Sequence, residues 1–309
     1  MRKILILFSL ILNTIAYAQE NKTEFSLQEA IDFALENNRK SKNAALDIDA
    51  AIKQKWETTA TGLPQLSATV DYQNAIKRNV FVFGNDIIPA GSKHTLTGTA
   101  TLSQLLFDGS YLVGLQSAKV YLEISKNAKT KTDLEVRKAV INAYGNVLLA
   151  KESVAILEKN ITVLEKNLSD ITKIFENGLE EEESVEQLKI TLSSVKSNLN
   201  NTNRLKDLAY QMLNITIGKP INENTILTED LDALAIENIK LELLDTANNA
   251  ENTIDYKIAE NDKVSKELLV KLEKSKALPR LSAFINGGYS GNRESFNFTN
   301  TSEKWYGTS

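Results

Sequence analysis

The sequence predicts a mainly α protein with a small β part, built around long antiparallel coiled-coil helical hairpins. In one proline-free segment, apolar residues recur in steps of three and four over about five heptads, a pattern typical of coiled coils. Before it, two shorter segments alternate apolar and polar residues with the period of two that strands have. Four prolines and thirteen glycines in 309 residues leave room for long helices.

The first eighteen residues have the three-part pattern of an export signal, and we interpret 1–18 as a signal peptide. Arg2 and Lys3 are followed by an apolar run over 4–12 and by the small-x-small motif 16–18. The run is too short for the roughly 20 residues of a membrane-spanning helix, and no later stretch is apolar enough for one. A membrane-inserted part of the mature chain is therefore expected to consist of strands.

A first helix is expected from Ser26 to about Thr61. Ser26 and Glu29 have the spacing of a capping box, with apolar residues at helical spacing behind them. Gly62 and Pro64 end the helix.

A strand hairpin is expected within 64–107, with strands at 66–72 and 95–103 and a loop at about 77–93. The alternation fits a soluble hairpin that packs one face on a core. It fits equally a membrane-barrel hairpin with an apolar face toward lipid and a polar face toward water. The segments have about the 9–11 residues that a tilted membrane strand needs.

A long helical hairpin is expected over 110–217. One helix is expected over about 110–175, because the segment has no proline and little glycine and its part 140–175 carries the heptad steps. Gly178 suits the left-handed position that ends a helix. Ser184 and Gln187 have the spacing of a second capping box, which would start the returning helix. Because the connection is short, the two helices should be antiparallel.

The rest of the chain suggests an internal repeat. A mixed, acidic segment without a firm period follows to about 244 and completes a first unit, 19–244. Residues 63–68 (Leu-Pro-Gln-Leu-Ser-Ala) return at 278–283 as Leu-Pro-Arg-Leu-Ser-Ala, after a helix expected over about 245–276 and before a short strand. We therefore expect 245–309 to be the start of a second repeat, which is incomplete in this chain.

Composition argues against several functions. A net charge of −4 offers no basic excess for nucleic acid, so no nucleic-acid partner is expected. There is no cysteine and a single histidine, His94, which is expected at the surface. Neither a multi-histidine metal site nor a histidine-based triad can be built from one imidazole. We predict that the protein is not an enzyme and has no catalytic residue, no cofactor and no metal ligand.

Several short motifs, in this order and spacing, resemble those of the TolC-type outer-membrane factors. No single motif is specific, but together they extend over nearly all of the mature chain. They are Phe25-Ser26-Leu27-Gln28-Glu29-Ala30, Ala34-Leu35-Glu36-Asn37-Asn38, Leu63-Pro64, Leu105-Leu106-Phe107-Asp108-Gly109, Gly178-Leu179 and Ile217-Gly218.

The resemblance implies an architecture and partners. In that family three protomers each give four membrane strands to one β-barrel, and their helices form an α-barrel that crosses the periplasm. Hairpin ends meet a periplasmic adaptor (membrane fusion) protein of an inner-membrane transporter. By that analogy Gly178, Leu179, Ser184 and Val185 are the candidate adaptor-contact residues. The acidic run 180–183 before them is unusual for the family and fits either a solvated turn or a patch for a partner.

The resemblance also implies a function and a location. We expect a homotrimeric outer-membrane channel of a tripartite efflux or type I secretion system, a passive conduit with strands in outer-membrane lipid and helices in the periplasm. The alternative is a soluble periplasmic coiled-coil adaptor or scaffold, which explains the export signal and the heptads but not the repeated helix-to-strand units. An exported helical enzyme is a weaker rival, because no nucleophile motif is present.

Overall fold

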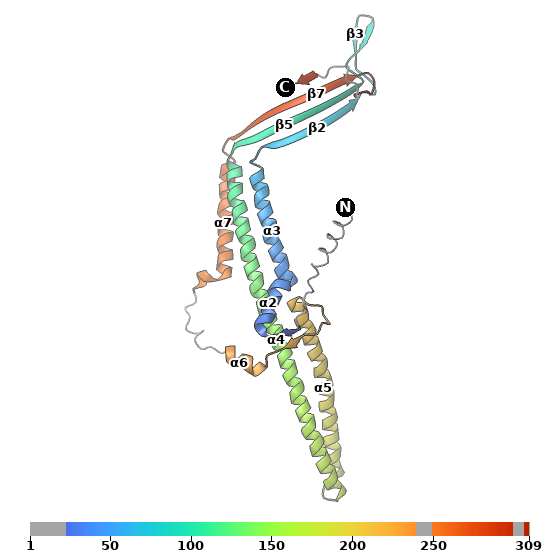
Figure 1. The fold of residues 1–309 in the computed structure, drawn as a ribbon, viewed down its shortest axis with the longest axis vertical. Helices are drawn as coiled ribbons and strands as arrows, with labels where there is room; N and C mark the ends of the chain where they lie inside the picture. The colour runs from blue at the N-terminus through green and yellow to red at the C-terminus, as the bar shows by residue number, and fades with distance from the viewer. Residues whose placement is uncertain (1–22, 239–248, 299–305, 309) are drawn as a thin grey trace, which may run out of the picture. The chain divides into compact units, whose positions relative to one another are not determined.

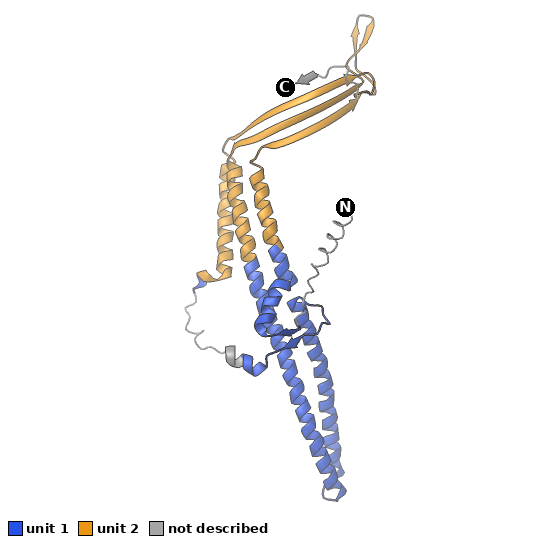
Figure 2. Cartoon of the chain, viewed as in Figure 1, with its two compact units in different colours: residues 1–45, 129–250 blue, residues 46–128, 251–309 orange. Residues whose placement is uncertain are grey.

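The structure is a computed structural model, and it describes residues 23–238, 249–298 and 306–308 (Figure 1). The predicted signal peptide lies outside these residues. Contacts divide the chain into two compact units (Figure 2), one of residues 1–45 with 129–250 and the other of residues 46–128 with 251–309. Two helices, α3 (Arg39–Ala60) and α4 (Gly109–Glu176), run from one unit into the other.

The first unit contains the long helical hairpin. The heptad-rich helix is confirmed as α4, which has 68 residues, and the returning helix is α5 (Glu182–Ile217). Gly218 ends α5 with φ +91° and donates its N–H to the carbonyl oxygens of Asn214 and Ile215. The left-handed conformation suits glycine, so the predicted end of the hairpin is confirmed.

The core of the first unit lies where α2 (Leu27–Asn37) packs against this hairpin. Its fully buried apolar side chains come from three separate parts of the sequence, namely Phe25, Ala30, Ala34, Val140, Tyr144, Val147, Leu213 and Ile217. The capping box of α2 is confirmed, since Ser26 Oγ accepts from the N–H of Glu29 and the Glu29 carboxylate accepts from the N–H of Ser26.

The prediction of one unbroken helix over 26–61 is wrong. Asn38 has extended backbone angles (φ −62°, ψ 135°) and separates α2 from α3. Its side chain explains the break: Nδ2 donates to the carbonyl oxygen of Thr216, 2.7 Å away, and Oδ1 accepts from the N–H of Lys40 at 2.8 Å. The amide therefore caps α3 and fastens the break to the end of α5.

Short elements that the sequence did not predict complete the first unit. β1 (Glu24–Phe25) pairs in parallel with β6 (Ile226–Leu227) within the segment expected to be mixed. A helix, α6 (Leu231–Asn238), follows. Both strands have only two residues, too few for a period-two pattern to show in sequence.

The second unit contains a four-stranded antiparallel sheet of order β2-β5-β7-β8. β2 (Gln65–Asn74) and β5 (His94–Asp108) form the predicted hairpin, although β5 extends beyond the expected 95–103. β7 (Arg280–Arg293) pairs along β5 and is longer than the short strand expected there; β8 (Tyr306–Thr308) pairs with β7. The pairing with β2 ends at Ser103, and pairing with β7 alone continues β5 to Asp108. A register shift lies between Leu105 and Phe107 in this last part.

The expected loop at 77–93 contains a second hairpin. β3 (Val80–Phe83) and β4 (Asp86–Pro89) form a two-stranded sheet of their own, joined by the two-residue turn Gly84-Asn85, with Gly84 at φ +62°. The turn residues match a tight hairpin, so the sequence did carry this signal.

The helices of the second unit are the adjoining parts of α3 and α4, a short 3₁₀ turn η3 (Ala250–Asn252), and α7 (Ile254–Ser275). The helix predicted to begin at 245 has its N-cap at Thr253, whose side chain accepts from the N–H of Tyr256. Residues 245–248 lie outside the described part. The threonine cap sets the start of α7.

Candidate functional site

The strand register aligns the apolar residues of three strands on one face of the sheet. Leu66 pairs with Leu102, which pairs with Ile285, and Val70 pairs with Gly98, which pairs with Tyr289. Directly paired residues in an antiparallel sheet share a face. The β2–β5 hairpin and β7, which lie nearly 200 residues apart in the sequence, therefore form one continuous apolar surface.

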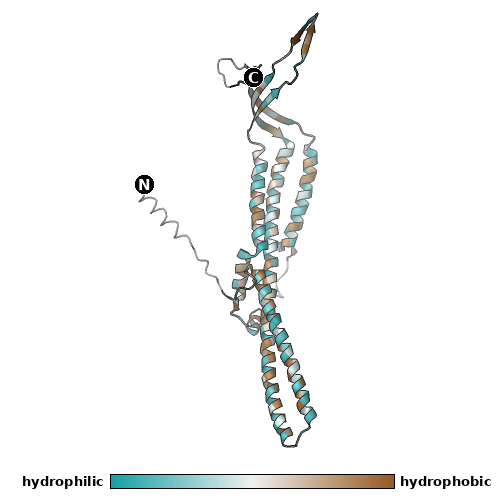
Figure 3. Cartoon of the chain, turned by 90° about the vertical axis from the view of Figure 1, so that its right-hand side faces the viewer, coloured by the Kyte–Doolittle hydropathy of each residue, from teal (hydrophilic) through white to brown (hydrophobic). Residues whose placement is uncertain are grey.

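This apolar face is open. Leu66, Val70 and Ile285 are 75%, 74% and 75% exposed, and Tyr289 is 59% exposed. Figure 3 shows hydrophobic and hydrophilic residues in succession along the strands. Described residues of the chain do not cover this face, so the hypothesis of a soluble hairpin with one face on its own core does not fit.

The opposite face is polar and carries its own side-chain bonds. Asp71, Thr97 and Ser290 lie across it in one row, and Gln73, Thr95 and Asn292 lie in the next. Thr95 Oγ1 donates to Asn292 Oδ1 at 2.9 Å, and the hydroxyls of Thr97 and Ser290 are 3.2 Å apart. Such a face suits contact with water.

An aromatic cluster lies at one end of the sheet. Tyr72 Oη and His94 Nδ1 are 2.8 Å apart, the two rings stack, and Phe296 meets both edge-on. Phe298 stands edge-on to Tyr72 as well. His94 is 9% exposed, so the expectation of a surface histidine is wrong. Its ring is covered by residues that sequence alone could not bring together.

At the hairpin tip, a tight turn joins α4 to α5. Gly178 has φ +71° and donates to the carbonyl oxygen of Phe175; Leu179 donates to that of Ile174. Leu179 is 78% exposed and is followed by the acidic run 180–183. The turn therefore presents one apolar side chain to the surroundings.

The two other candidate residues at the tip have different environments. The capping box predicted at Ser184 is absent, because α5 begins at Glu182 with Glu181 as its N-cap. Ser184 instead lies in the first turn, where its Oγ donates to Glu180 Oε1 at 2.6 Å. Acidic residues in that turn are favoured by the helix dipole, which explains the earlier start. Val185 is 4% exposed and packs in the hairpin. Of the four residues, Gly178 and Leu179 form the exposed turn.

A second apolar stripe on α4, not identified from the sequence, is exposed. It comprises Leu134, Ile141, Leu149, Ile156 and Val163, each between 44% and 57% exposed. The steps of seven and eight residues place them along one side of the helix, apart from the buried seam residues Val140, Val147 and Val154. This second heptad-like spacing is a signal that the sequence did contain.

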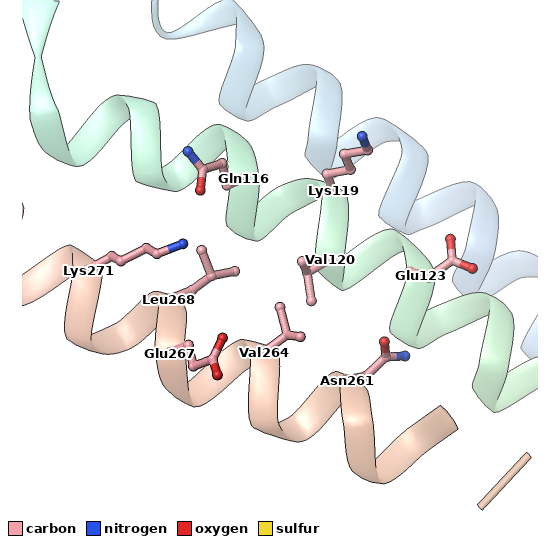
Figure 4. Close-up of a pocket in the computed structure, with 9 residues that line it drawn as sticks. All are labelled: Gln116, Lys119, Val120, Glu123, Asn261, Val264, Glu267, Leu268 and Lys271. Carbon is pink, nitrogen blue, oxygen red and sulfur yellow. The ribbon is translucent and has the colours of Figure 1, made fainter. Parts of the chain in front are cut away.

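A groove of about 440 Å³ lies between α4 and α7 in the second unit (Figure 4). Val120, Val264 and Leu268 line its apolar part, and lysines and glutamates from both helices surround them. Within the described residues, Asn261 Nδ2 is buried without a hydrogen-bond partner. The mixed charges fit no single class of small ligand.

No helix in 23–238 or 249–298 is long and apolar enough to cross a membrane. In the same ranges, no group of three or more histidine, cysteine, aspartate or glutamate side chains is arranged to hold a metal ion.

Comparison with known proteins identifies the family. A profile of the family described as outer membrane efflux protein matches residues 30–219, more than half of the chain. The chain belongs to this family, so the resemblance to TolC-type factors is confirmed. No curated protein sequence matches it.

Solved structures show the same fold. The chain is similar to CusC (18% identity, TM-score 0.69, covering 91% of this chain and 64% of that one) and to VceC of Vibrio cholerae (17%, 0.65, 91% and 66%). It is also similar to the CmeC outer membrane channel of Campylobacter jejuni (17%, 0.63, 95% and 65%). The chain spans a little under two thirds of the length of these three proteins. The predicted combination of long helices and channel-type strands is confirmed.

Proposed function

We propose that the protein is the outer-membrane channel component of a tripartite efflux or type I secretion system. The observation that carries the proposal is the amphipathic sheet: one face aligns exposed apolar residues from three strands, and the other is polar and hydrogen-bonded. A sheet with an apolar face toward lipid and a polar face toward a water-filled lumen is the design of membrane strands.

The sheet also supports assembly as a homotrimer. β2 is an edge strand, paired only on its β5 side among the described strands. Lipid does not tolerate an open sheet edge, and membrane barrels have at least about eight strands. Further copies of the chain supply strands for this edge. The exposed stripe on α4 (Leu134–Val163) adds a helical surface for the same assembly.

The tip is the proposed contact with a periplasmic adaptor of an inner-membrane transporter. Gly178 sets the turn and Leu179 provides its exposed apolar side chain. Ser184 acts by fixing Glu180, and Val185 by holding α5 against α4. The helices then lie in the periplasm, and substrates pass through the lumen by diffusion.

The alternative of a soluble periplasmic adaptor or scaffold is less well supported. Burial of a large apolar side chain stabilises a protein by about 1.5–3 kcal/mol. A soluble protein would lose this free energy at each apolar residue that the three strands leave exposed to water. Membership of the outer membrane efflux protein family favours the channel as well.

The test is membrane insertion with a matched pair of variants on adjacent residues. Val70→Lys places a charge on the apolar face, whereas Thr69→Lys places it on the polar face. A lysine facing mid-bilayer costs about 2–4 kcal/mol. We expect Val70→Lys to reduce the protein recovered from outer membranes and Thr69→Lys to leave it unchanged.

The same preparation tests the channel. Purified wild-type protein should be trimeric by light scattering in detergent and should conduct ions in a planar lipid bilayer. Recovery in the soluble periplasmic fraction, with equal behaviour of both lysine variants, would contradict the proposal.

A further inference from the structure

The β3–β4 hairpin is an apolar projection at one end of the sheet. Six of its eight strand residues are large and apolar, and all are exposed: Val80 (52%), Phe81 (66%), Val82 (67%), Phe83 (80%), Ile87 (67%) and Ile88 (52%). Together they present on the order of 600 Å² of apolar surface, at the upper end of the largest patch on a typical monomer. Such a surface marks an interaction site.

The hairpin is apolar on both faces. Its register puts Val80, Val82 and Ile87 on one face with Pro89, and Phe81, Phe83 and Ile88 on the other with Asp86. A two-stranded hairpin is marginally stable in water by itself. Both faces therefore need a cover.

Lipid does not provide that cover. The apolar band of the sheet ends at the aromatic cluster of Tyr72, His94, Phe296 and Phe298, where aromatic girdles of membrane strands lie. At the same level Arg78 Nη1 makes an ion pair with Glu294 at 2.8 Å. β3 and β4 project beyond this end of the sheet in Figure 1. In addition, the outer edges of the hairpin have backbone groups that hydrocarbon cannot satisfy.

We propose that the β3–β4 hairpin packs against the same hairpin of the other copies of this chain, forming an apolar constriction at the outer mouth of the channel. The inference rests on the proposed trimer and adds an interface and a gate to it. From 79 to 92, Asp86 is the one charged residue, so copies brought around an axis meet little repulsion. The exposed area per copy approaches the ~800 Å² that each partner contributes to a standard interface.

The geometry gives the contact a role in transport. An apolar constriction impedes polar solutes by dewetting, so the hairpins hold the mouth closed at rest. Their separation from the lipid band lets them move without disturbing the sheet's pairing.

The test uses a single cysteine, because the sequence contains none. In the full chain, purified from outer membranes, Phe83→Cys is oxidised and analysed on a non-reducing gel. Three thiols around one axis pair two at a time, so we expect up to about two thirds of the chains in a disulfide-linked dimer that reductant reverses. The control is Ile76→Cys, 97% exposed near the base of the hairpin, which should stay monomeric on the gel.

The outcomes separate this proposal from the channel itself. Light scattering of the unoxidised variant reports the trimer: a monomer overturns the channel assembly and this interface together. A trimer without the Phe83→Cys dimer, or with equal linkage at both positions, overturns the interface alone. Strong quenching of a bimane label on Phe83→Cys by brominated lipid would also overturn the interface, because it would place the hairpin in the bilayer.

A second variant tests the gate. Phe81→Ser combined with Phe83→Ser should raise conductance over wild type, and unchanged conductance contradicts the gate.

Discussion

Gly218 is the residue whose backbone most limits substitution. Its φ is +91°, and a Cβ built on it would lie 2.5 Å from the carbonyl oxygen of Asn37. Both the left-handed conformation and the close approach of α2 therefore require glycine. We predict that Gly218→Ala lowers the free energy of unfolding by about 1–3 kcal/mol, seen as a lower melting temperature in detergent.

A matched control lies in the same unit. Gly145 is inside α4, and a Cβ built there meets nothing within 4 Å. Gly145→Ala should stabilise the helix by roughly 0.5–1 kcal/mol. If the two alanine variants melt alike, the close contact at Gly218 does not matter for stability.

Tyr144 predicts how stability depends on alkaline pH. Burial raises the pKa of its phenol well above the usual value of 10.0, and the negative charge of Glu229 adds to the shift. The neutral phenol donates to the carbonyl oxygen of Phe25 at 3.1 Å. Because the folded pKa is raised, this stability is present below about pH 10 and is lost as the pH rises through the folded pKa.

We therefore expect the melting temperature to fall as the pH rises above about 10, with up to about 1.4 kcal/mol lost per pH unit there. Tyr144→Phe should cost about 1 kcal/mol at pH 7 and show a smaller fall at alkaline pH. A residual fall is expected from Tyr210, whose pKa burial also raises. An unchanged slope in the variant would show that Tyr144 is not the group responsible.

Single residues were predictable where the signal was local. The capping box at Ser26 depends on residues three apart, and sequence reading found it. The burial of His94 and the break at Asn38 depend on Phe296 and Thr216, which are far away in the chain. No local sequence pattern predicts such distant partners.

At the scale of elements, the tip makes a prediction about coupling to a partner. Leu179→Asp removes the exposed apolar side chain without touching the seam of the hairpin, so the fold should be unchanged by circular dichroism. We expect it to abolish resistance or secretion that depends on the channel in cells. Ser169→Asp, which puts the same charge on an exposed position of α4 away from the stripe, should keep full activity. Equal activity of both variants would remove the tip from the adaptor contact.

Elements were predicted best where one pattern continued for many residues. Both ends of α4 were predicted within a residue or so, because the segment lacks proline, has little glycine and carries five heptads in its second half. The extra length of β5 and the pairing of β1 with β6 were not predicted. Hydrogen bonds to strands far away in the sequence stabilise both features, and no alternation of apolar and polar residues marks them.

At the scale of the whole molecule, the exposed stripe on α4 predicts an assembly defect. Ile156→Glu lies on the stripe, 49% exposed in the single chain, so it should leave secondary structure unchanged and lower the trimer fraction in detergent. Thr162→Glu, which adds the same charge at an exposed position on another side of the helix, is the control and should assemble normally. A trimer fraction equal to wild type in both variants would place the copies' contacts elsewhere.

The class of architecture could be predicted from the sequence, but the pairing of distant segments could not. β2 and β5 could be placed side by side because they are close in sequence. After the repeated Leu-Pro motif, β7 pairs with the other side of β5. The paired residues are nearly 200 positions apart, and sequence spacing alone does not specify such a pairing. The assignment of 19–244 and 245–309 as repeats stays a proposal.

The two compact units interleave along the chain: each takes one early segment and one late segment. Neither unit is complete until synthesis has passed residue 250. During most of translation, the nascent chain therefore exposes the apolar faces of its strands and the apolar seam of α4. We therefore expect newly made chains to need holdase chaperones, and depletion of those chaperones should show first as aggregation of newly made protein.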